Sequence, residues 1–448
     1  VTAQINKVVI TNGWEFRQVG TAKWNAATVP GEVHSDLLNN KMIPDPYYRD
    51  NEEKLQWIEK KDWEYKTSFS VSSSTLKQKN AELVFDGLDT YATVYLNGKL
   101  VLKADNMFRQ WRVNVKPYLR SGENSLKIVF ESAQNVVDSL AKKDLPFVIP
   151  DNPRTYVRKA QYHFGWDWGP KLTTCGVWKE VRLESYNQKP KEKEYVPSRK
   201  VELVQQPDSI GKSFYFKIDG KPVYMKGANY IRSDALLSRV TKKEYEKVIK
   251  MAKDANMNML RVWGGGIYED DYFYDLCDKY GINVWQDFMF AGAMVPGDDA
   301  FFDNVREEVK YQVKRLRHHK SIVLWCGNNE VDEAFNNWGW QKSMKMSKQD
   351  STKLWKDYVR LFQDSIPKWV KEVDPTRPYT SSSPLFGWGR EKSYTEGDSH
   401  YWGTWWGLAD IEAVQNRTGR FLSEYCMQAI PNYSTTKKIT LEEDRHLY

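Results

Sequence analysis

Residues 322–330 read Ile-Val-Leu-Trp-Cys-Gly-Asn-Asn-Glu, an apolar run that ends in three polar residues. A short continuous apolar run is typical of a strand buried on both faces, as in a parallel sheet covered by helices. The polar ending places Glu330 at the carboxyl end of that strand. This stretch therefore predicts an α/β fold in which a strand carries a carboxylate to one edge of the sheet.

The sequence on either side repeats this alternation of strand and helix. Thr241-Lys-Lys-Glu244 matches a capping box, which begins a helix with a Thr at the N-cap and a Glu three residues later. Further strands are predicted over 257–263, 282–287 and 420–425, and further helices before Gly281 and over 305–316 and 350–373. Strands separated by helices at this spacing imply a parallel sheet. Because polar residues follow the strands, we predict a (β/α)8 barrel of the TIM type.

The first 186 residues have a different pattern. Apolar and polar residues alternate over 91–96, and Asn97-Gly98 follows, which is a strong signal for a hairpin with a type I′ turn. Helical spacing is scarce in this half, so we predict an antiparallel β-sandwich of the jelly-roll kind over residues 1–186. Residues 187–210 are charged and contain proline, as a linker would. Residues 211–448 are then assigned to the barrel, which makes the chain a multidomain protein.

Composition excludes several classes of protein. The formal net charge is only +7 over 448 residues, so a strongly basic nucleic-acid binder is disfavoured. We find no apolar run of 18 residues, so no membrane span is expected. The four cysteines lie far apart and no spacing indicates a cluster of metal ligands, so neither a zinc site nor a cofactor is expected. By contrast, 19 Trp in a 14% aromatic chain indicate large cores or surfaces that grip the flat apolar faces of sugars.

Two carboxylates fall at the ends of predicted strands. Glu330 ends the stretch quoted above, and Glu424 ends Arg420-Phe-Leu-Ser-Glu424. Two such residues on the active-site face of a barrel could flank one glycosidic bond. A separation of about 5–5.5 Å predicts a retaining mechanism, and one of about 6.5–9.5 Å an inverting mechanism. The alternative is structural: each Glu caps the following helix or pairs with an arginine such as Arg261.

Several segments resemble one known family. Residues 258–266, 325–330, 397–403 and 421–425 are similar to glycoside hydrolase family 2, and within it most similar to the β-mannosidases. Residues 86–98 resemble that family's sugar-binding jelly roll, and His163-Phe-Gly-Trp-Asp-Trp-Gly169 resembles the loop that this domain sends into the active site. The resemblance implies a retaining exo-β-mannosidase that releases terminal non-reducing mannose through a covalent glycosyl-enzyme.

The resemblance also implies roles for individual residues. Glu330 matches the acid/base, Glu424 the nucleophile, and Asn329 the residue that holds the sugar 2-hydroxyl. The remaining matches are all residues of the sugar pocket: Asp167, Trp168, Trp263, Trp338, His400 and Tyr401. The implied substrates are β-mannosides, manno-oligosaccharides or fragments derived from N-glycans. The implied location is secreted, periplasmic or lysosomal.

These roles make physical demands on the site. The acid/base must begin protonated, so an apolar surround and a nearby anion should raise the pKa of Glu330. The nucleophile must be ionised, and Arg261 is a candidate cation, with a plain salt bridge in the barrel core as the alternative. For Trp168 and Trp263, the alternative to a sugar platform is ordinary core packing.

The chain departs from the family pattern in two places. Members carry an immunoglobulin-like domain between jelly roll and barrel, yet residues 187–210 leave room only for a remnant such as its last strand at Val201-Glu-Leu-Val204. Only 24 residues follow Glu424, and Cys426 stands where a Gly is expected. We therefore expect a barrel that is incomplete at its C-terminal end, in a molecule that is truncated or spliced relative to a longer enzyme.

Two further interpretations stay open at the level of sequence. The chain could be another family 2 exo-glycosidase, namely a β-galactosidase, β-glucuronidase or exo-glucosaminidase, because a pocket for an axial 2-hydroxyl is not visible in one sequence. It could also be an inactive carbohydrate-binding fragment, since a barrel that lacks a strand exposes edges.

Overall fold

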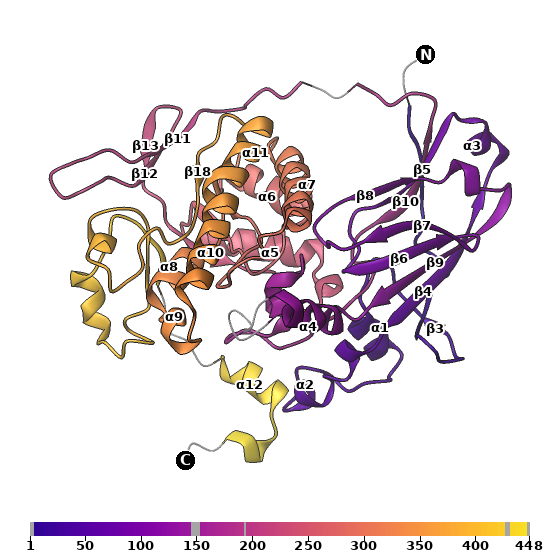
Figure 1. The fold of residues 1–448 in the computed structure, drawn as a ribbon, viewed down its shortest axis with the longest axis horizontal. Coiled ribbons are helices and arrows are strands. Elements are labelled where there is room, and N and C mark those ends of the chain that lie inside the picture. The colour runs from indigo at the N-terminus through magenta and orange to yellow at the C-terminus, as the bar shows by residue number, and fades with distance from the viewer. Residues whose placement is uncertain (1–3, 145–152, 192–193, 426–430, 446–448) are drawn as a thin grey trace.

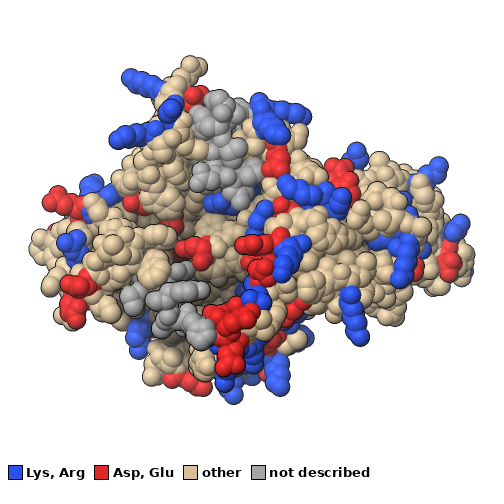
Figure 2. All heavy atoms as spheres, turned by 90° about the horizontal axis from the view of Figure 1, so that it is seen from below, with Lys and Arg blue, Asp and Glu red and all other residues tan. Residues whose placement is uncertain are grey.

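The computed structural model describes residues 4–144, 153–191, 194–425 and 431–445. Figure 1 shows a β-sandwich in indigo and purple beside a second, largely helical unit in magenta to yellow. No helix of the described residues is long and apolar enough to cross a membrane. Figure 2 views the molecule from below, and basic and acidic side chains are interspersed over that face.

The sandwich consists of two antiparallel sheets. The six-stranded sheet has the order β3-β2-β4-β9-β6-β7 and the four-stranded sheet the order β1-β10-β5-β8. Their bounds are β1 Asn6–Val9, β2 Glu15–Gln18, β3 Asn25–Ala26, β4 Trp63–Val71, β5 Asn80–Phe85, β6 Tyr91–Leu96, β7 Lys99–Ala104, β8 Trp111–Asn114, β9 Gly122–Glu131 and β10 Val181–Tyr186. Ala92, Val94 and Leu96 point into the core, as the alternation predicts. Asn97 and Gly98 both have positive φ and join β6 to β7, so the predicted hairpin is present.

The second unit is the barrel. A five-stranded parallel sheet runs in the order β14-β15-β16-β17-β18, and β19 pairs with β20 in a two-stranded parallel sheet. The bounds are β14 Gly227–Tyr230, β15 Met259–Val262, β16 Asn283–Asp287, β17 Ile322–Cys326, β18 Tyr379–Thr380, β19 Ser399–Tyr401 and β20 Leu422–Tyr425. Every strand residue of β15, β16 and β17 is buried, as expected for strands covered on both faces.

Helices cover the outer face of this sheet (Figure 1). The capping box at Thr241 begins α5, and Gly281 ends α6 in a left-handed conformation, both as predicted. The main helices are α5 Lys242–Asp254, α6 Asp271–Tyr280, α7 Asp299–Leu316, α8 Val331–Asn337, α10 Lys348–Tyr358 and α11 Ile366–Val373. The helix predicted over 350–373 is interrupted by a π-helical segment, Val359–Ser365. Pro367, which has no N–H to donate, follows just after this segment at the start of α11.

The first and last described barrel strands lie next to each other. Asn229 Nδ2 on β14 donates a 3.0 Å hydrogen bond to the carbonyl of Ser423 on β20. Within residues 4–144, 153–191, 194–425 and 431–445, no eighth strand joins them. Cys426, where a Gly was expected, lies outside the described residues.

A small antiparallel sheet closes one end of the barrel. It is made of β11 Val201–Val204, β12 Tyr215–Ile218 and β13 Lys221–Val223. Val201, Phe214 and Phe216 pack against barrel residues that include Trp285 and Phe421. The end of the predicted linker, 201–204, is therefore paired with the start of the barrel.

The sandwich and the barrel meet through a buried ion pair. Arg158, on a sandwich loop, donates to both carboxylate oxygens of Glu308 on α7, at 2.9 and 2.7 Å. Both side chains are fully buried, and Tyr268 Oη and Asn106 Nδ2 also donate to Glu308. A buried carboxylate with four donors is fully satisfied, so this contact fixes the sandwich against the barrel.

Candidate active site

The strand β17 delivers Glu330 to the carboxyl edge of the sheet, as its sequence predicts. The chain turns sharply there, and Glu330 has a φ of +61°, which non-glycine residues seldom adopt. Its backbone N–H donates to the carbonyl of Ser383 at 2.8 Å, which holds the turn in place. Helix α8 begins immediately after this residue, but the Glu330 side chain makes no capping hydrogen bond to it. The structural alternative of a helix cap is therefore wrong for Glu330.

Glu424, on β20, faces Glu330 with His400 between them. His400 Nδ1 lies 2.9 Å from Glu330 Oε1 and 3.4 Å from Glu424 Oε2. One oxygen of each carboxylate and one ring nitrogen all lie within 4.8 Å of one another. An inverting pair needs about 6.5–9.5 Å to admit a water, whereas a retaining pair stands about 5–5.5 Å apart. The facing oxygens of Glu330 and Glu424 therefore lie closer together than an inverting pair requires.

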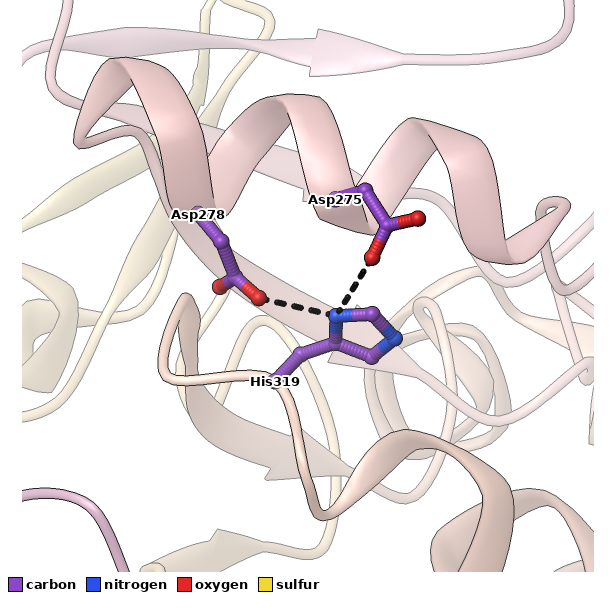
Figure 3. A group of neighbouring side chains, drawn as sticks. All are labelled: Asp275, Asp278 and His319. Carbon is purple, nitrogen blue, oxygen red and sulfur yellow. Dashed lines mark hydrogen bonds and ion pairs between the residues drawn. The ribbon is translucent and has the colours of Figure 1, made fainter.

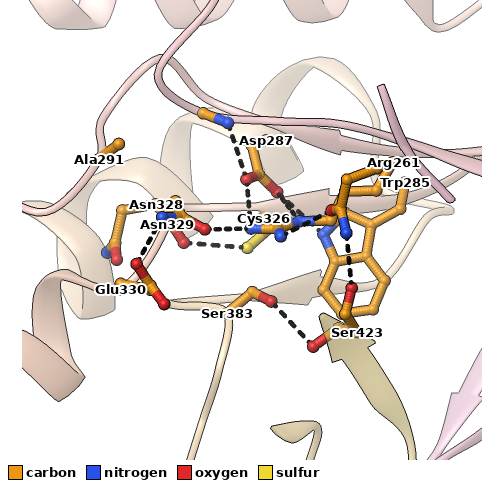
Figure 4. Close-up of polar contacts among 12 residues, drawn as sticks. Arg261, Trp285, Asp287, Ala291, Cys326, Asn328, Asn329, Glu330, Ser383 and Ser423 are labelled. Atoms are coloured by element: carbon orange, nitrogen blue, oxygen red, sulfur yellow. Dashed lines mark hydrogen bonds and ion pairs between the residues drawn. The ribbon is translucent and has the colours of Figure 1, made fainter. Parts of the chain in front are cut away.

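Arg261 holds this group together from β15. Its Nη1 donates to Glu424 Oε1 at 2.5 Å and to Asn229 Oδ1 at 3.0 Å, and its Nη2 donates to Asn329 Oδ1 at 2.7 Å. Nη2 and Nε also bond the two oxygens of Asp287, at 2.7 and 3.3 Å. Figure 4 shows the guanidinium with its contacts to Asp287 and Asn329. Both roles considered for Arg261 therefore apply: it is a core ion pair and the cation beside Glu424.

Replacing Arg261 with Met is expected to reduce the free energy of unfolding by about 3–5 kcal/mol, because two buried carboxylates lose their cation. Urea unfolding followed by tryptophan fluorescence measures this change. The matched control is Arg306→Met on α7, where an arginine with 39% of its side chain exposed pairs with Asp303. That change should stay within about 0.5 kcal/mol. Equal losses in the two variants would contradict the structural role of Arg261.

The buried setting shifts the pKa values of the three facing groups. Burial raises the pKa of Glu330 to about 7, although the Arg261 charge and a hydrogen bond from Asn329 act in the opposite direction. Burial also raises the pKa of Glu424, against the opposing effects of His400 and Arg261. Burial lowers the pKa of His400 to about 4, so its imidazole is neutral at neutral pH. Glu330 is thus poised to give and take a proton near neutrality.

A cavity of about 670 Å³ opens above the two carboxylates. It is lined by all of the predicted site residues except one: Asp167, Trp168, Trp263, Asn329, Glu330, Trp338, His400 and Glu424. Tyr401, predicted for the sugar pocket, is not among the lining residues. It is 2% exposed, and its ring packs edge-on against Trp388 at 6.3 Å. Its side chain therefore supports the wall of the cavity from behind.

The sandwich contributes one wall of this cavity. Tyr162 N–H donates to the carbonyl of Gly265 at 3.0 Å, which anchors the loop that follows to the barrel. Trp166 and Trp168 then meet Trp263 edge-on, at ring distances of 4.9 and 5.4 Å. Trp263 is buried, whereas Trp168 is 43% exposed and available to a ligand. Core packing thus describes Trp263 better than Trp168.

Four lining residues beyond the predictions are also tryptophans, namely Trp166, Trp388, Trp402 and Trp406. Trp402 lies within the segment 397–403, which carries part of the resemblance, so this residue could have been selected from the sequence. Trp406 is 65% exposed and stands in no predicted element. Ser383, which contacts the Glu330 backbone and the His400 ring, has no sequence signal at all.

The fold also assembles groups of possible metal ligands that no sequence spacing indicates. Besides Glu330, His400 and Glu424, the residues Asp275, Asp278 and His319 come together on the outer face of the barrel. Figure 3 shows both carboxylates turned toward one nitrogen of His319. Asp278 also accepts the Ser321 N–H at 2.7 Å and so ties α6 to the start of β17. The contacts of this outer group are those of a structural hydrogen-bonded cluster.

A pair of buried carboxylates at the carboxyl ends of barrel strands, beneath aromatic side chains, is the kind of site that glycoside hydrolases use. Two family models match the chain. One, described as "Glycosyl hydrolase 2 galactose-binding domain-like", matches residues 14–179. The other, described as "Glycosyl hydrolases family 2, TIM barrel domain", matches residues 211–395. The chain belongs to glycoside hydrolase family 2.

Its similar relatives are β-mannosidases. The chain is 32% identical to the β-mannosidase of Bos taurus and 32% identical to the β-mannosidase B of Emericella nidulans, with 98% of the chain covered in both. It spans 63% and 64% of the length of these two proteins. The alignment with the Bos taurus protein runs over 566 residues, more than the 448 of this chain, so that relative holds additional residues between the matched segments.

Solved structures agree on the fold. The crystal structure of the β-D-mannosidase from Dictyoglomus thermophilum has a TM-score of 0.88 and 36% identity. The match covers 98% of this chain and 65% of the Dictyoglomus thermophilum chain. The Amycolatopsis orientalis exo-chitosanase CsxA matches with a TM-score of 0.67 at 14% identity, over 98% of this chain and 60% of its own. The second likeness concerns the fold alone. The predicted fold class, a sandwich with a TIM-type barrel, is confirmed.

Proposed function

We propose that this protein is a retaining exo-β-mannosidase, with Glu424 as nucleophile and Glu330 as acid/base. The observation that carries the proposal is the separation of the two carboxylates, whose facing oxygens lie within 4.8 Å. The match to β-mannosidases over 98% of the chain supports the choice of sugar. The proposed substrates are terminal β-mannosides of manno-oligosaccharides or fragments derived from N-glycans.

The proposal gives each atom of the first step a role. Arg261 occupies Oε1 of Glu424, so Oε2 is free to attack the anomeric carbon. As the bond from that carbon to Glu424 forms, the bond to the leaving oxygen breaks, and Glu330 gives its proton to that oxygen. In the second step Glu330, now a carboxylate, takes a proton from a water that attacks the same carbon and releases Glu424.

Asn329 is suited to hold the sugar 2-hydroxyl. Its Oδ1 accepts from Arg261 at 2.7 Å, and its Nδ2 donates to Glu330 Oε2 at 3.1 Å. The amide orientation is thereby fixed, and the second Nδ2 hydrogen remains for a sugar hydroxyl. An uncharged donor in this position can strengthen its bond as charge develops on the sugar ring.

The two domains divide the work in this proposal. The sandwich, residues 1–186, supplies Asp167 and Trp168 to the cavity, and the barrel supplies the catalytic pair. Because β11 pairs with β12, we place the start of the barrel unit at residue 201, within the segment 187–210 that the sequence predicts to be a linker. The alignment of 566 residues with the Bos taurus relative shows that this relative holds residues that the chain lacks, which supports the proposal that the body of an immunoglobulin-like domain is missing here. The family resemblance favours a secreted, periplasmic or lysosomal location.

A panel of aryl β-glycosides tests the activity. We expect kcat/KM for the β-mannoside to exceed that for the β-galactoside, β-glucuronide and β-glucosaminide by about 100-fold or more, since a site that bonds one hydroxyl arrangement rejects others strongly. Proton NMR of the first product should show the β-anomer of mannose. Faster release from another sugar would favour a different exo-glycosidase, an α-anomer would exclude retention, and no turnover at all would favour a carbohydrate-binding fragment.

A further inference from the structure

A buried carboxylate behind the catalytic pair has no role in the mechanism above. Asp398 is fully buried just before β19. Its Oδ2 accepts hydrogen bonds from Ser383 Oγ and Ser423 Oγ, both at 2.6 Å, and its Oδ1 accepts from the Leu385 N–H at 2.9 Å. Three donors point at this carboxylate, as expected for an ionised, acceptor-only group.

The number of available protons decides which atom donates in each hydrogen bond from Asp398 through Ser383 to His400. A serine hydroxyl has one proton to give, and the Ser383 proton goes to Asp398 at 2.6 Å rather than to Ser423 Oγ at 3.4 Å. Toward His400 Nε2, at 3.0 Å, the Ser383 oxygen can then only accept. His400 Nε2 must therefore carry the hydrogen. In a neutral imidazole the other nitrogen, Nδ1, is then a bare acceptor.

That bare nitrogen faces the acid/base. Glu330 Oε1 lies 2.9 Å from His400 Nδ1, which is hydrogen-bonding distance, whereas Glu424 Oε2 lies 3.4 Å away. Two acceptors cannot bond each other, so the 2.9 Å contact requires a proton on Glu330. The longer contact to Glu424 fits a carboxylate that has none.

We propose that Asp398 and Ser383 are positioning residues that hold His400 in its Nε2–H tautomer, so that His400 Nδ1 accepts the proton of Glu330 and keeps the acid in its protonated form. The inference rests on the proposed function and assigns His400 a part in proton placement in addition to its place in the cavity wall. If Nδ1 carried the hydrogen, it would donate to either carboxylate and favour its ionised form.

The charged groups around His400 come from several elements. Glu330 follows β17, Glu424 is on β20, Arg261 is on β15 and Asp398 precedes β19, and Asp167 of the sandwich loop acts on Glu330. Of these groups, only Asp398 reaches the ring through Nε2, by way of Ser383. The Nε2 side of His400 therefore sets its tautomer independently of the reacting carboxylates.

NMR reads the tautomer without any need for turnover. The chain has six His, and labelling them with 15N gives two-bond correlations that distinguish Nε2–H from Nδ1–H imidazoles. Comparison with His400→Gln assigns the signals of His400. At pH 6–7 we expect the Nε2–H pattern in the unaltered protein, and the Nδ1–H pattern in Asp398→Asn, where the Ser383 hydroxyl is released to donate to Nε2.

A matched pair of serines tests the functional consequence. Ser383→Ala and Ser423→Ala each remove one 2.6 Å bond to Asp398, but only Ser383 contacts His400. The basic limb is the fall of kcat/KM as the pH rises. In Ser383→Ala the midpoint of this fall should move down by about one pH unit, because His400 Nδ1–H can then stabilise ionised Glu330. In Ser423→Ala that limb should stay where it is in the unaltered protein.

The proposal stands only if both readouts agree. An Nδ1–H pattern in the unaltered protein overturns it, and so does an equal shift, or no shift, of the basic limb in the two serine variants. If Ser383→Ala fails to fold, the tautomers of the unaltered protein and of Asp398→Asn decide. If no glycoside is turned over, the proposed function fails while the NMR result still tests the tautomer.

Discussion

Replacing Glu424 with Gln is expected to lower kcat for an aryl β-mannoside by at least about 10⁴-fold, because no other group can form the glycosyl-enzyme. The change keeps the size of the side chain and removes the charge that Arg261 binds at 2.5 Å. Steady-state release of the aryl group measures the loss. A residual rate within tenfold of the unaltered enzyme would show that Glu424 is not the nucleophile.

Chemical trapping separates loss of the nucleophile from loss of the site. A 2-deoxy-2-fluoro-β-mannosyl fluoride should add one fluoromannosyl group to the unaltered protein, seen by intact mass, and peptide mapping should place it on Glu424. Glu330→Gln is the matched control, because fluoride leaves without a proton and this variant should still be labelled. Labelling of Glu424→Gln would contradict the assignment.

Replacing Glu330 with Gln is expected to have an effect that depends on the leaving group. For a mannoside whose leaving group needs protonation, kcat/KM should fall by about 10²–10⁴-fold, the usual worth of a general acid. For a dinitrophenyl mannoside, which needs no acid, the loss in kcat/KM should be about tenfold or less. Equal losses on both substrates would exclude the role of acid.

The same residue sets the sign of the pH dependence. In the proposed mechanism only protonated Glu330 can start the reaction, and burial raises the pKa of its carboxyl to about 7. Activity of the unaltered enzyme on the poor leaving group should therefore fall as the pH rises through about 7. In Glu330→Gln this basic limb should disappear from the residual kcat/KM for the same mannoside, and its persistence would assign the limb to another group.

The general architecture could be predicted from the sequence because the relevant signals are local. The apolar run before Glu330, the Asn97-Gly98 turn and the capping box at Thr241 each depend on neighbouring residues alone, and each element formed as predicted. The two glutamates could also be selected, since the carboxyl end of a barrel strand defines the active-site face.

What the sequence could not provide are contacts between distant segments. Ser383, Asp398 and His400 form one chain of hydrogen bonds only because the loop after β18 lies between β17 and β19. Tyr401 illustrates the opposite case: its neighbour His400 faces the cavity, and the alternation of a strand turns Tyr401 to the other side. The π-helical turn at Val359–Ser365 likewise has no signal in the helical periodicity.

The buried Arg158–Glu308 pair has a consequence for how substitutions can affect the shape of the cavity. Because Trp168 reaches the barrel from the sandwich, the pocket belongs to neither folding unit by itself. Loosening the contact at Arg158 would let the cavity wall that carries Trp168 move relative to the barrel. Conversely, substitutions in the short loop around Trp168 can alter selectivity without disturbing the arginine network beneath the two carboxylates.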